Sequence, residues 1–143
     1  MKFGPIYIDH IGIATSDLEE GSVFWNLLGL ELAGSDETVA SQGVTTRFFN
    51  TSPIDANIKP AKVELLEPTG DETPVGRFLS KRGPGIQQLC FRVGDLEGLL
   101  HHLKENGIRL INEEPTVGAG GKLIAFVHPA STGGVLVELT QSV

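Results

Sequence analysis

The chain has 143 residues, of which 40% are hydrophobic and 20% are charged, and its net charge is −7. This length predicts one well-packed domain, and this composition is that of an ordinary globular protein rather than a disordered or fibrous one. The eleven Lys and Arg residues are scattered along the chain. Nucleic-acid binding needs clustered basic residues, so this charge pattern argues against a nucleic-acid partner.

Two absences predict where the protein resides. No apolar run is long enough for a signal peptide or for a membrane-spanning helix, so we expect no membrane association. The single cysteine, Cys90, cannot form a disulfide within the chain, and such cysteine usage is typical of a reducing compartment. We therefore expect a cytoplasmic protein.

The first half of the chain is repeated in the second half. Residues 9–32, DHIGIATSDLEEGSVFWNLLGLEL, align without a gap on residues 87–110, QQLCFRVGDLEGLLHHLKENGIRL. The tripeptide VEL, at 63–65, recurs at 137–139. Identity between the halves is low, but the order of signals is the same, which indicates one structural unit used twice.

In the first unit the pattern predicts a strand, a helix and three short strands. The first strand covers Tyr7–Ala14. The helix begins after Ser16, which we interpret as the N-cap, with Glu19 completing a capping box. It ends at Gly29, where a left-handed residue is expected. The three strands lie near Glu31, at Thr45–Phe49 and at Lys62–Leu66.

The second unit follows a short linking helix, for which Thr73 is the predicted cap and Pro74 the first residue. Its elements are the strand Ile86–Val93, a helix capped by Asp95 with an apolar stripe at Leu96, Leu99, Leu100 and Leu103, and strands near Arg109, at Leu123–Val127 and at Val135–Thr140. The prediction is an α+β fold made of two tandem βαβββ modules. They form a single domain, 1–143, with module 6–67, linker helix region 68–85 and module 86–141.

Strand alternation places four potential ligands on the strand faces that point away from the helices. Side chains along a strand alternate between two faces. His10 then lies opposite Ile11 and Ile13, on the face away from the helices. The repeat makes His10 equivalent to Gln88, and Glu64 equivalent to Glu138. If the modules pack side by side into one curved mixed sheet, all four converge, and their donors suit a divalent cation. The alternative is an ordinary polar strand face.

Several motifs then carry a family resemblance: DHIGIATSDLEE, KVELLEPTGDETPVGRFLSKRGPGIQQL and EEPTVGAGGKLIAFVHPASTGGVLVELTQ. The chain resembles the methylmalonyl-CoA epimerase family of the vicinal oxygen chelate superfamily, which has the glyoxalase fold around a metal cleft. The resemblance implies an isomerase that epimerises methylmalonyl-CoA by C2 proton abstraction through a metal-stabilised enolate. It also implies a homodimer and an acyl-CoA substrate.

The family's metal positions fall on His10, Glu64, Gln88 and Glu138, which implies a divalent metal: Co²⁺, or alternatively Mn²⁺, Mg²⁺, Zn²⁺ or Ni²⁺. Glu138 is the candidate for one proton-transfer role and Glu64 for the other. Two residues depart from the family pattern. Gln88 replaces the usual histidine, and its harder amide oxygen favours Mn²⁺ or Mg²⁺ relative to Zn²⁺ or Co²⁺. Thr46 stands where some relatives have a glutamate base.

Two other functions remain open at this point. A glyoxalase I-type isomerase (lactoylglutathione lyase) uses the same four ligand types, with His and Gln exchanged between the halves. A non-enzymatic small-molecule binding protein of the same fold is the second alternative, although four intact ligands count against it. A ring-cleaving dioxygenase is disfavoured, because its iron site needs two histidines.

Overall fold

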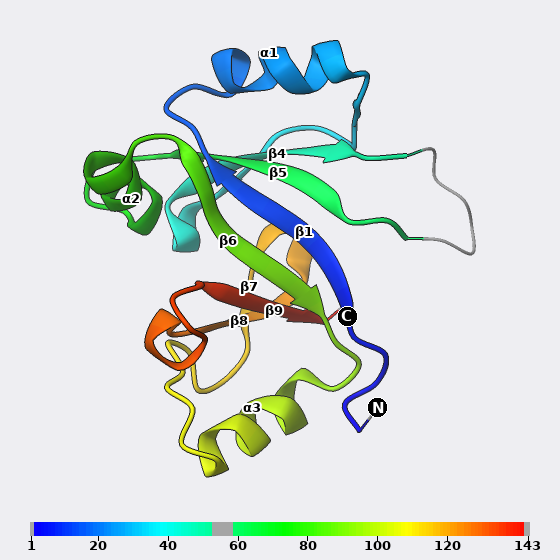
Figure 1. The fold of residues 1–143 in the computed structure, drawn as a ribbon, viewed down its shortest axis with the longest axis vertical. Helices are drawn as coiled ribbons and strands as arrows, with labels where there is room; N and C mark the ends of the chain where they lie inside the picture. The colour runs from blue at the N-terminus through cyan, green and yellow to red at the C-terminus, as the bar shows by residue number, and fades with distance from the viewer. Residues whose placement is uncertain (1, 53–58, 142–143) are drawn as a thin grey trace. The chain divides into compact units, whose positions relative to one another are not determined.

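The computed structural model describes residues 2–52 and 59–141 (Figure 1). The elements are β1 (Tyr7–Ala14), α1 (Leu18–Leu28), β2 (Glu31–Leu32), β3 (Glu37–Val39), β4 (Val44–Asn50), β5 (Lys62–Pro68), α2 (Pro74–Arg82), β6 (Gly85–Arg92), α3 (Leu96–Glu105), β7 (Thr116–Val117), β8 (Leu123–Val127) and β9 (Val137–Gln141). They form two compact units, 10–87 and 1–9 together with 88–143. No helix within the described ranges is long and apolar enough to cross a membrane.

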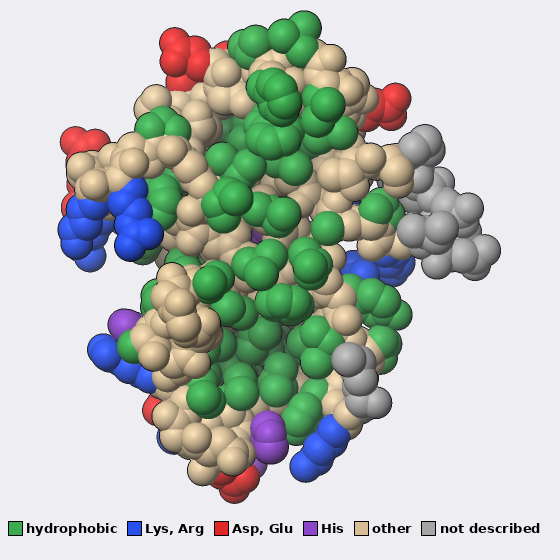
Figure 2. All heavy atoms as spheres, in the orientation of Figure 1, with side chains coloured by type: hydrophobic (Ala, Val, Ile, Leu, Met, Phe, Trp, Pro, Cys, Tyr) green, Lys and Arg blue, Asp and Glu red, His purple; other side chains and the backbone are tan. Residues whose placement is uncertain are grey.

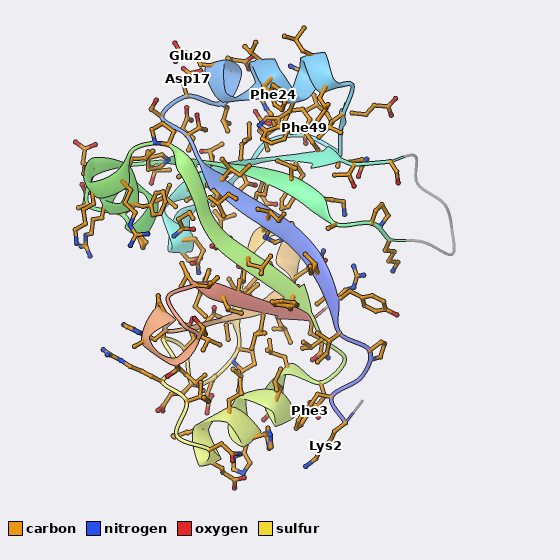
Figure 3. All side chains as sticks on the ribbon, in the orientation of Figure 1. Lys2, Phe3, Asp17, Glu20, Phe24 and Phe49 are labelled. Atoms are coloured by element: carbon orange, nitrogen blue, oxygen red, sulfur yellow. The ribbon has the colours of Figure 1, made fainter. Side chains whose placement is uncertain are left out.

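The unit of residues 10–87 contains a mixed sheet with α1 along one face. Its strands are ordered β2-β4-β5-β1, with β3 added to β4, and β1 pairs with β5 in parallel. The buried residues Leu18, Phe49, Val63 and Leu65 form its core under α1. Figure 3 shows Phe49 pointing from the sheet toward the helix. Trp25 packs against this cluster, so the apolar face of the amphipathic helix meets the apolar face of the sheet.

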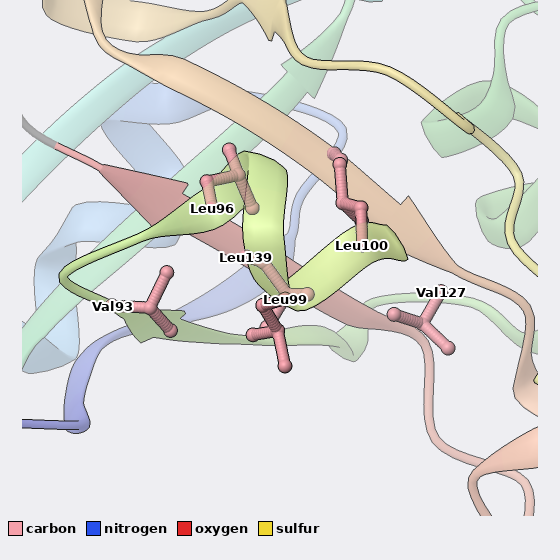
Figure 4. Close-up of a cluster of buried hydrophobic side chains, with 7 residues drawn as sticks. Val93, Leu96, Leu99, Leu100, Val127 and Leu139 are labelled. Carbon is pink, nitrogen blue, oxygen red and sulfur yellow. The ribbon is translucent and has the colours of Figure 1, made fainter. Parts of the chain in front are cut away.

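The unit of residues 1–9 and 88–143 repeats the plan with the strand order β6-β9-β8-β7 and with β6 parallel to β9. Its core is the leucine stripe predicted for α3, packed on strand residues. The cluster comprises Val93, Leu96, Leu99, Leu100, Ala125, Val127 and Leu139 (Figure 4). The N-terminal segment belongs to this unit because the Phe3 carbonyl accepts hydrogen bonds from the backbone amides of Gly94 and Asp95.

The repeat extends to individual hydrogen bonds. The Thr15 amide donates to the Leu66 carbonyl at 2.9 Å, and the equivalent Val93 amide donates to the Thr140 carbonyl at 2.8 Å. The first backbone amide of each long helix also donates to a side chain of a strand. In the first unit, the amide of Leu18 donates to Glu67 Oε1 at 3.3 Å. In the other unit, the Leu96 amide donates to Gln141 Oε1 at 2.7 Å. The predicted α+β fold with two βαβββ modules is confirmed, whereas the module boundaries remain a prediction.

The predicted elements differ from the structure in their shortest parts. β3 and β7 were not predicted, since three and two residues are too few for a recognisable alternation. The strand expected near Arg109 is only an isolated bridge between Leu110 and Val127. The linking helix is α2, which begins at Pro74 after the cap Thr73, as predicted.

The predicted N-cap of the first helix was wrong. The cap is Asp17, whose Oδ1 accepts the Glu20 amide at 2.9 Å, rather than Ser16 paired with Glu19. Figure 3 shows Asp17 and Glu20 together at the start of α1. Asp17 is the repeat equivalent of Asp95, whose Oδ1 caps α3 by accepting the Gly98 amide at 3.0 Å. A carboxylate at this end also interacts favourably with the helix dipole.

Arg47, on the helix side of β4, ties α1 to the sheet. Its guanidinium donates to Ser22 Oγ at 2.9 Å and to the Leu18 carbonyl at 3.3 Å. It also forms ion pairs with Glu19 and Asp36, each at 2.8 Å. Hydrogen bonding to Asp36 and then to Glu19 raises the pKa of Arg47, and the same guanidinium lowers the pKa of Asp36 below its ordinary 3.8.

Replacing the cap tests the corrected helix start. We expect Asp17→Ala to lower the free energy of unfolding by about 1 kcal/mol, because the Glu20 amide loses its acceptor. Ser16→Ala is the matched control and should change stability by less than about 0.5 kcal/mol. Urea denaturation of both variants measures the difference. A larger loss in Ser16→Ala than in Asp17→Ala would restore Ser16 as the cap.

The ion pair of Asp36 predicts an acid-dependent contribution to stability. A carboxyl with a lowered folded-state pKa stabilises the fold above its unfolded pKa, and this stabilisation is lost as the pH falls through the folded value. Asp36→Asn should cost no more than about 1 kcal/mol at pH 7, since the pair is partly exposed. The cost should begin to shrink as the pH falls through the ordinary pKa of 3.8 and should vanish below the lowered folded-state pKa. Denaturation at several pH values checks this, and a cost independent of pH would contradict it.

Candidate functional site

One pair of the predicted ligands lies on neighbouring parallel strands of the unit 10–87. Glu64 on β5 is in register with Gly12 on β1, so His10 comes two residues before the partner of Glu64. His10 Nε2 lies 3.1 Å from Glu64 Oε1, and both side chains are less than a tenth exposed. Phe48, the β4 partner of Glu64, meets the His10 ring edge-on with a centroid distance of 5.3 Å. The structure therefore brings His10 and Glu64 together beside an apolar ring.

The second pair occupies the equivalent strands of the other unit. Glu138 on β9 is in register with Cys90 on β6, so Gln88 again comes two residues before the partner of the glutamate. Gln88 and Glu138 are 6% and 7% exposed. Phe126 on β8 is the cross-strand partner of Glu138, as Phe48 is of Glu64. The repeat equivalence inferred from sequence thus holds in the strand register.

These residues offer the kinds of donor atom that divalent cations bind. An imidazole nitrogen, an amide oxygen and two carboxylates are donors that Co²⁺, Mn²⁺ and Mg²⁺ accept. The 3.1 Å between His10 Nε2 and Glu64 Oε1 matches the separation of about 3 Å between neighbouring ligands of an octahedral ion with bonds of about 2.1 Å. Burying carboxylates is unfavourable unless a cation or hydrogen bonds compensate for their charge. Their use as metal ligands remains a prediction.

A buried ion pair next to His10 was missed from the sequence. The Asp9 carboxylate, 6% exposed, accepts a hydrogen bond from Arg92 Nη1 at 3.1 Å. The Arg92 guanidinium also lies over the Tyr7 ring, 5.0 Å from its centroid. Asp9 and Arg92 are 83 residues apart, so no local pattern predicts their contact. Arg92 compensates for the charge of the buried Asp9 carboxylate and so stabilises it.

Thr46 and Cys90 lie on the strand faces that carry the predicted ligands. Thr46 is 2% exposed and lies two residues before Phe48 on β4, and its hydroxyl donates to the Glu37 carbonyl at 3.5 Å. Cys90 is fully buried. Thr46 has no group of suitable basicity, so this position supplies no base.

The chain matches a family model over most of its length. The model describes the glyoxalase/bleomycin resistance protein/dioxygenase superfamily, and it matches residues 9–126. The chain belongs to this superfamily, in agreement with its repeated βαβββ units and the buried polar pair in each of them.

Similar proteins within the superfamily are methylmalonyl-CoA epimerases. The mitochondrial methylmalonyl-CoA epimerase of Bos taurus is 36% identical, over 97% of this chain and 78% of its own length. The ethylmalonyl-CoA/methylmalonyl-CoA epimerase of Cereibacter sphaeroides is 36% identical, over 94% of this chain and 96% of its own. A Streptomyces coelicolor methylmalonyl-CoA epimerase structure with 2-nitronate-propionyl-CoA has a TM-score of 0.88 at 32% identity, covering 98% of this chain and 95% of that one. The resemblance stated from the motifs is confirmed.

Metal titration tests the ligand set. We expect His10→Ala and Glu138→Gln each to weaken Mn²⁺ binding by more than the roughly tenfold loss typical of an outer-sphere partner, because each removes a donor atom. Isothermal titration calorimetry gives the affinities. His101→Ala is the control, since that imidazole lies on the surface beside Glu105. Unchanged affinity in both ligand variants would remove these residues from the metal site.

A reverse substitution in the same titration tests the role of Gln88. Gln88→His replaces an amide oxygen with a softer nitrogen donor, so affinity for Zn²⁺ and Co²⁺ should rise relative to Mn²⁺ and Mg²⁺. An unchanged order of affinities would show that Gln88 does not contact the metal.

Proposed function

We propose that this protein epimerises methylmalonyl-CoA by moving the C2 proton, with Glu138 and Glu64 as the proton carriers. The observation that carries the proposal is the pair of buried glutamates at equivalent positions of the two units, each beside a polar donor and a phenylalanine. The relatives from Bos taurus and Cereibacter sphaeroides act as epimerases by name. These relatives confirm the sequence-based prediction of an epimerase.

The residues proposed to hold a divalent metal are His10, Glu64, Gln88 and Glu138. A bound dication would polarise the thioester and carboxylate oxygens of the substrate and thereby make its C2 proton acidic enough for a carboxylate base. The resemblance favours Co²⁺, whereas the amide oxygen of Gln88 makes Mn²⁺ and Mg²⁺ relatively more competitive.

Epimerisation needs a base on one side of the C2 carbon and a proton donor on the other. Glu138 is proposed for the first role and Glu64 for the second, because the two glutamates come from equivalent strands of two related units. Thr46 cannot serve as a base, and Asp9 is held by Arg92. Phe48 and Phe126, each the cross-strand partner of one glutamate, reduce the access of water to the proton carriers.

The proposal also includes a homodimer and a cytoplasmic location. The outer face of α1 exposes four apolar side chains, Val23, Phe24, Leu27 and Leu28, of which Leu27 is 82% exposed. A patch of this kind on a helix is typical of an interaction surface, and it supports a homodimer. The single cysteine of the chain supports a cytoplasmic location.

The activity is tested by proton NMR of methylmalonyl-CoA in D₂O with metal-reconstituted protein, following loss of the C2 proton signal. We expect rapid metal-dependent exchange in the wild type. In Glu138→Gln the exchange should fall by about a hundredfold or more, since the amide cannot carry a proton. Glu113→Gln removes an exposed carboxylate and should retain the wild-type rate.

Two outcomes would contradict the proposal. Full exchange in Glu138→Gln would remove this residue from proton transfer. Absence of exchange with Co²⁺, Mn²⁺ and Mg²⁺ would exclude the epimerase, and hemithioacetals of glutathione would then test a glyoxalase I-type reaction.

A further inference from the structure

Helix α2 carries a concentrated positive charge on an acidic protein. Arg77, Lys81 and Arg82 are three of the eleven basic residues of a chain whose net charge is −7. All three are exposed, and none forms an ion pair with a residue in the described ranges. Figure 2 shows Lys and Arg side chains gathered over α2. Although the basic residues are scattered over the chain as a whole, three of them lie within the six residues 77–82.

Of the eight basic residues outside α2, three form ion pairs with acidic groups in the described ranges. Arg47 is bound by Glu19 and Asp36, Arg92 by Asp9, and Lys104 by Glu113. On α2, by contrast, Arg77 and Lys81 are four residues apart and therefore neighbours of like charge, an arrangement that is unfavourable on its own. Lys81 and Arg82 also lie in the last turn, where a cation interacts favourably with the helix dipole. This effect does not account for Arg77.

The cluster is held on a firmly docked helix. Thr73 Oγ1 accepts the Gly76 amide at 3.1 Å, and Val75 is only 4% exposed. A Cβ atom at Gly76 would lie 2.3 Å from the Gly70 carbonyl oxygen, so this turn packs directly on the preceding loop. The Arg82 guanidinium lies over the Phe78 ring, 5.8 Å from its centroid. The positive groups are therefore presented from a fixed backbone.

The same unit contains half of the candidate site. α2 packs against β5, the strand that carries Glu64. β5 ends at Pro68, four residues after Glu64, and four residues of extended strand span about 13 Å at roughly 3.3 Å per residue. The pantetheine arm of coenzyme A likewise separates the reacting acyl group from the phosphate groups, so the groups that bind these phosphates must lie away from Glu64, as α2 does beyond the end of β5.

We propose that Arg77, Lys81 and Arg82 bind the phosphate groups of the coenzyme A part of the substrate. This inference rests on the proposed function. Coenzyme A carries a diphosphate and a ribose phosphate, and guanidinium groups bind phosphate oxygens with paired, charge-assisted hydrogen bonds. A protein with a net negative charge repels such a ligand, so a local positive patch is needed to attract and orient it.

The test compares two triple variants that remove the same charge. One carries Arg77→Gln, Lys81→Gln and Arg82→Gln. The control carries Lys2→Gln, Lys104→Gln and Arg109→Gln, all at exposed positions outside α2. The first probe is adenosine 3′,5′-bisphosphate, whose Kd is measured by calorimetry. The second measurement gives KM and kcat for two substrates. These are methylmalonyl-CoA and methylmalonyl-pantetheine, which lacks the nucleotide phosphates.

We expect the α2 variant to raise the bisphosphate Kd and the KM for the coenzyme A thioester by about tenfold or more. Its kcat, its KM for the pantetheine thioester and its melting temperature should match the wild type. Wild-type values of Kd and KM in the α2 variant, or an equal loss in the control variant, would overturn the inference while leaving the epimerase intact. Bisphosphate binding that depends on α2 in a protein without epimerase activity would retain the inference and remove the proposed function.

Discussion

The parallel pairing of the first and last strands in each unit is the constraint on which the candidate site depends. β1 lies beside β5 and β6 beside β9 with the same offset, so a polar residue on one strand always comes two positions before the partner of a glutamate on the other. Parallel neighbours cannot be joined by a tight turn, which leaves room between them for a helix and further strands.

The hydrophobic cores fix this register. Val63 and Leu65 pack under α1, and Leu139 packs under α3, whereas Glu64 and Glu138 occupy the intervening positions. A slip of one residue would turn the apolar side chains away from the helices and place the glutamates in the core. The cost of such a slip is large, so packing on one face of the sheet positions the chemistry on the other. Stability and site geometry are thus two consequences of one pairing.

The alternation of side chains along strands and the repeat between the two halves made much of the fold predictable from the sequence. The strand β1 and the helix α2 were found at their observed starts, and the equivalence of His10 with Gln88 was read from the aligned halves. The wrong cap at Ser16 came from preferring a local capping-box pattern over the repeat, which already pointed to Asp17. Arg47, and the pair of Asp9 with Arg92, depend on contacts between residues far apart in sequence, for which local patterns contain no signal. The same is true of α2, where the basic residues are visible in sequence, but the absence of ion pairs to them within the described part of the chain is not.

The division of the chain between the two units affects when each unit can fold during synthesis. The unit of residues 10–87 is continuous in sequence, whereas the other unit combines residues 1–9 with 88–143 through backbone bonds such as those from Gly94 and Asp95 to Phe3. During translation the continuous unit can be completed while the ribosome is still producing the second repeat. The backbone bonds of Phe3 can form only once Gly94 and Asp95 have been synthesised, so the second unit cannot close before the chain has passed these residues. The segment around Phe3 therefore meets its packing partners only after the continuous unit, residues 10–87, has been synthesised in full.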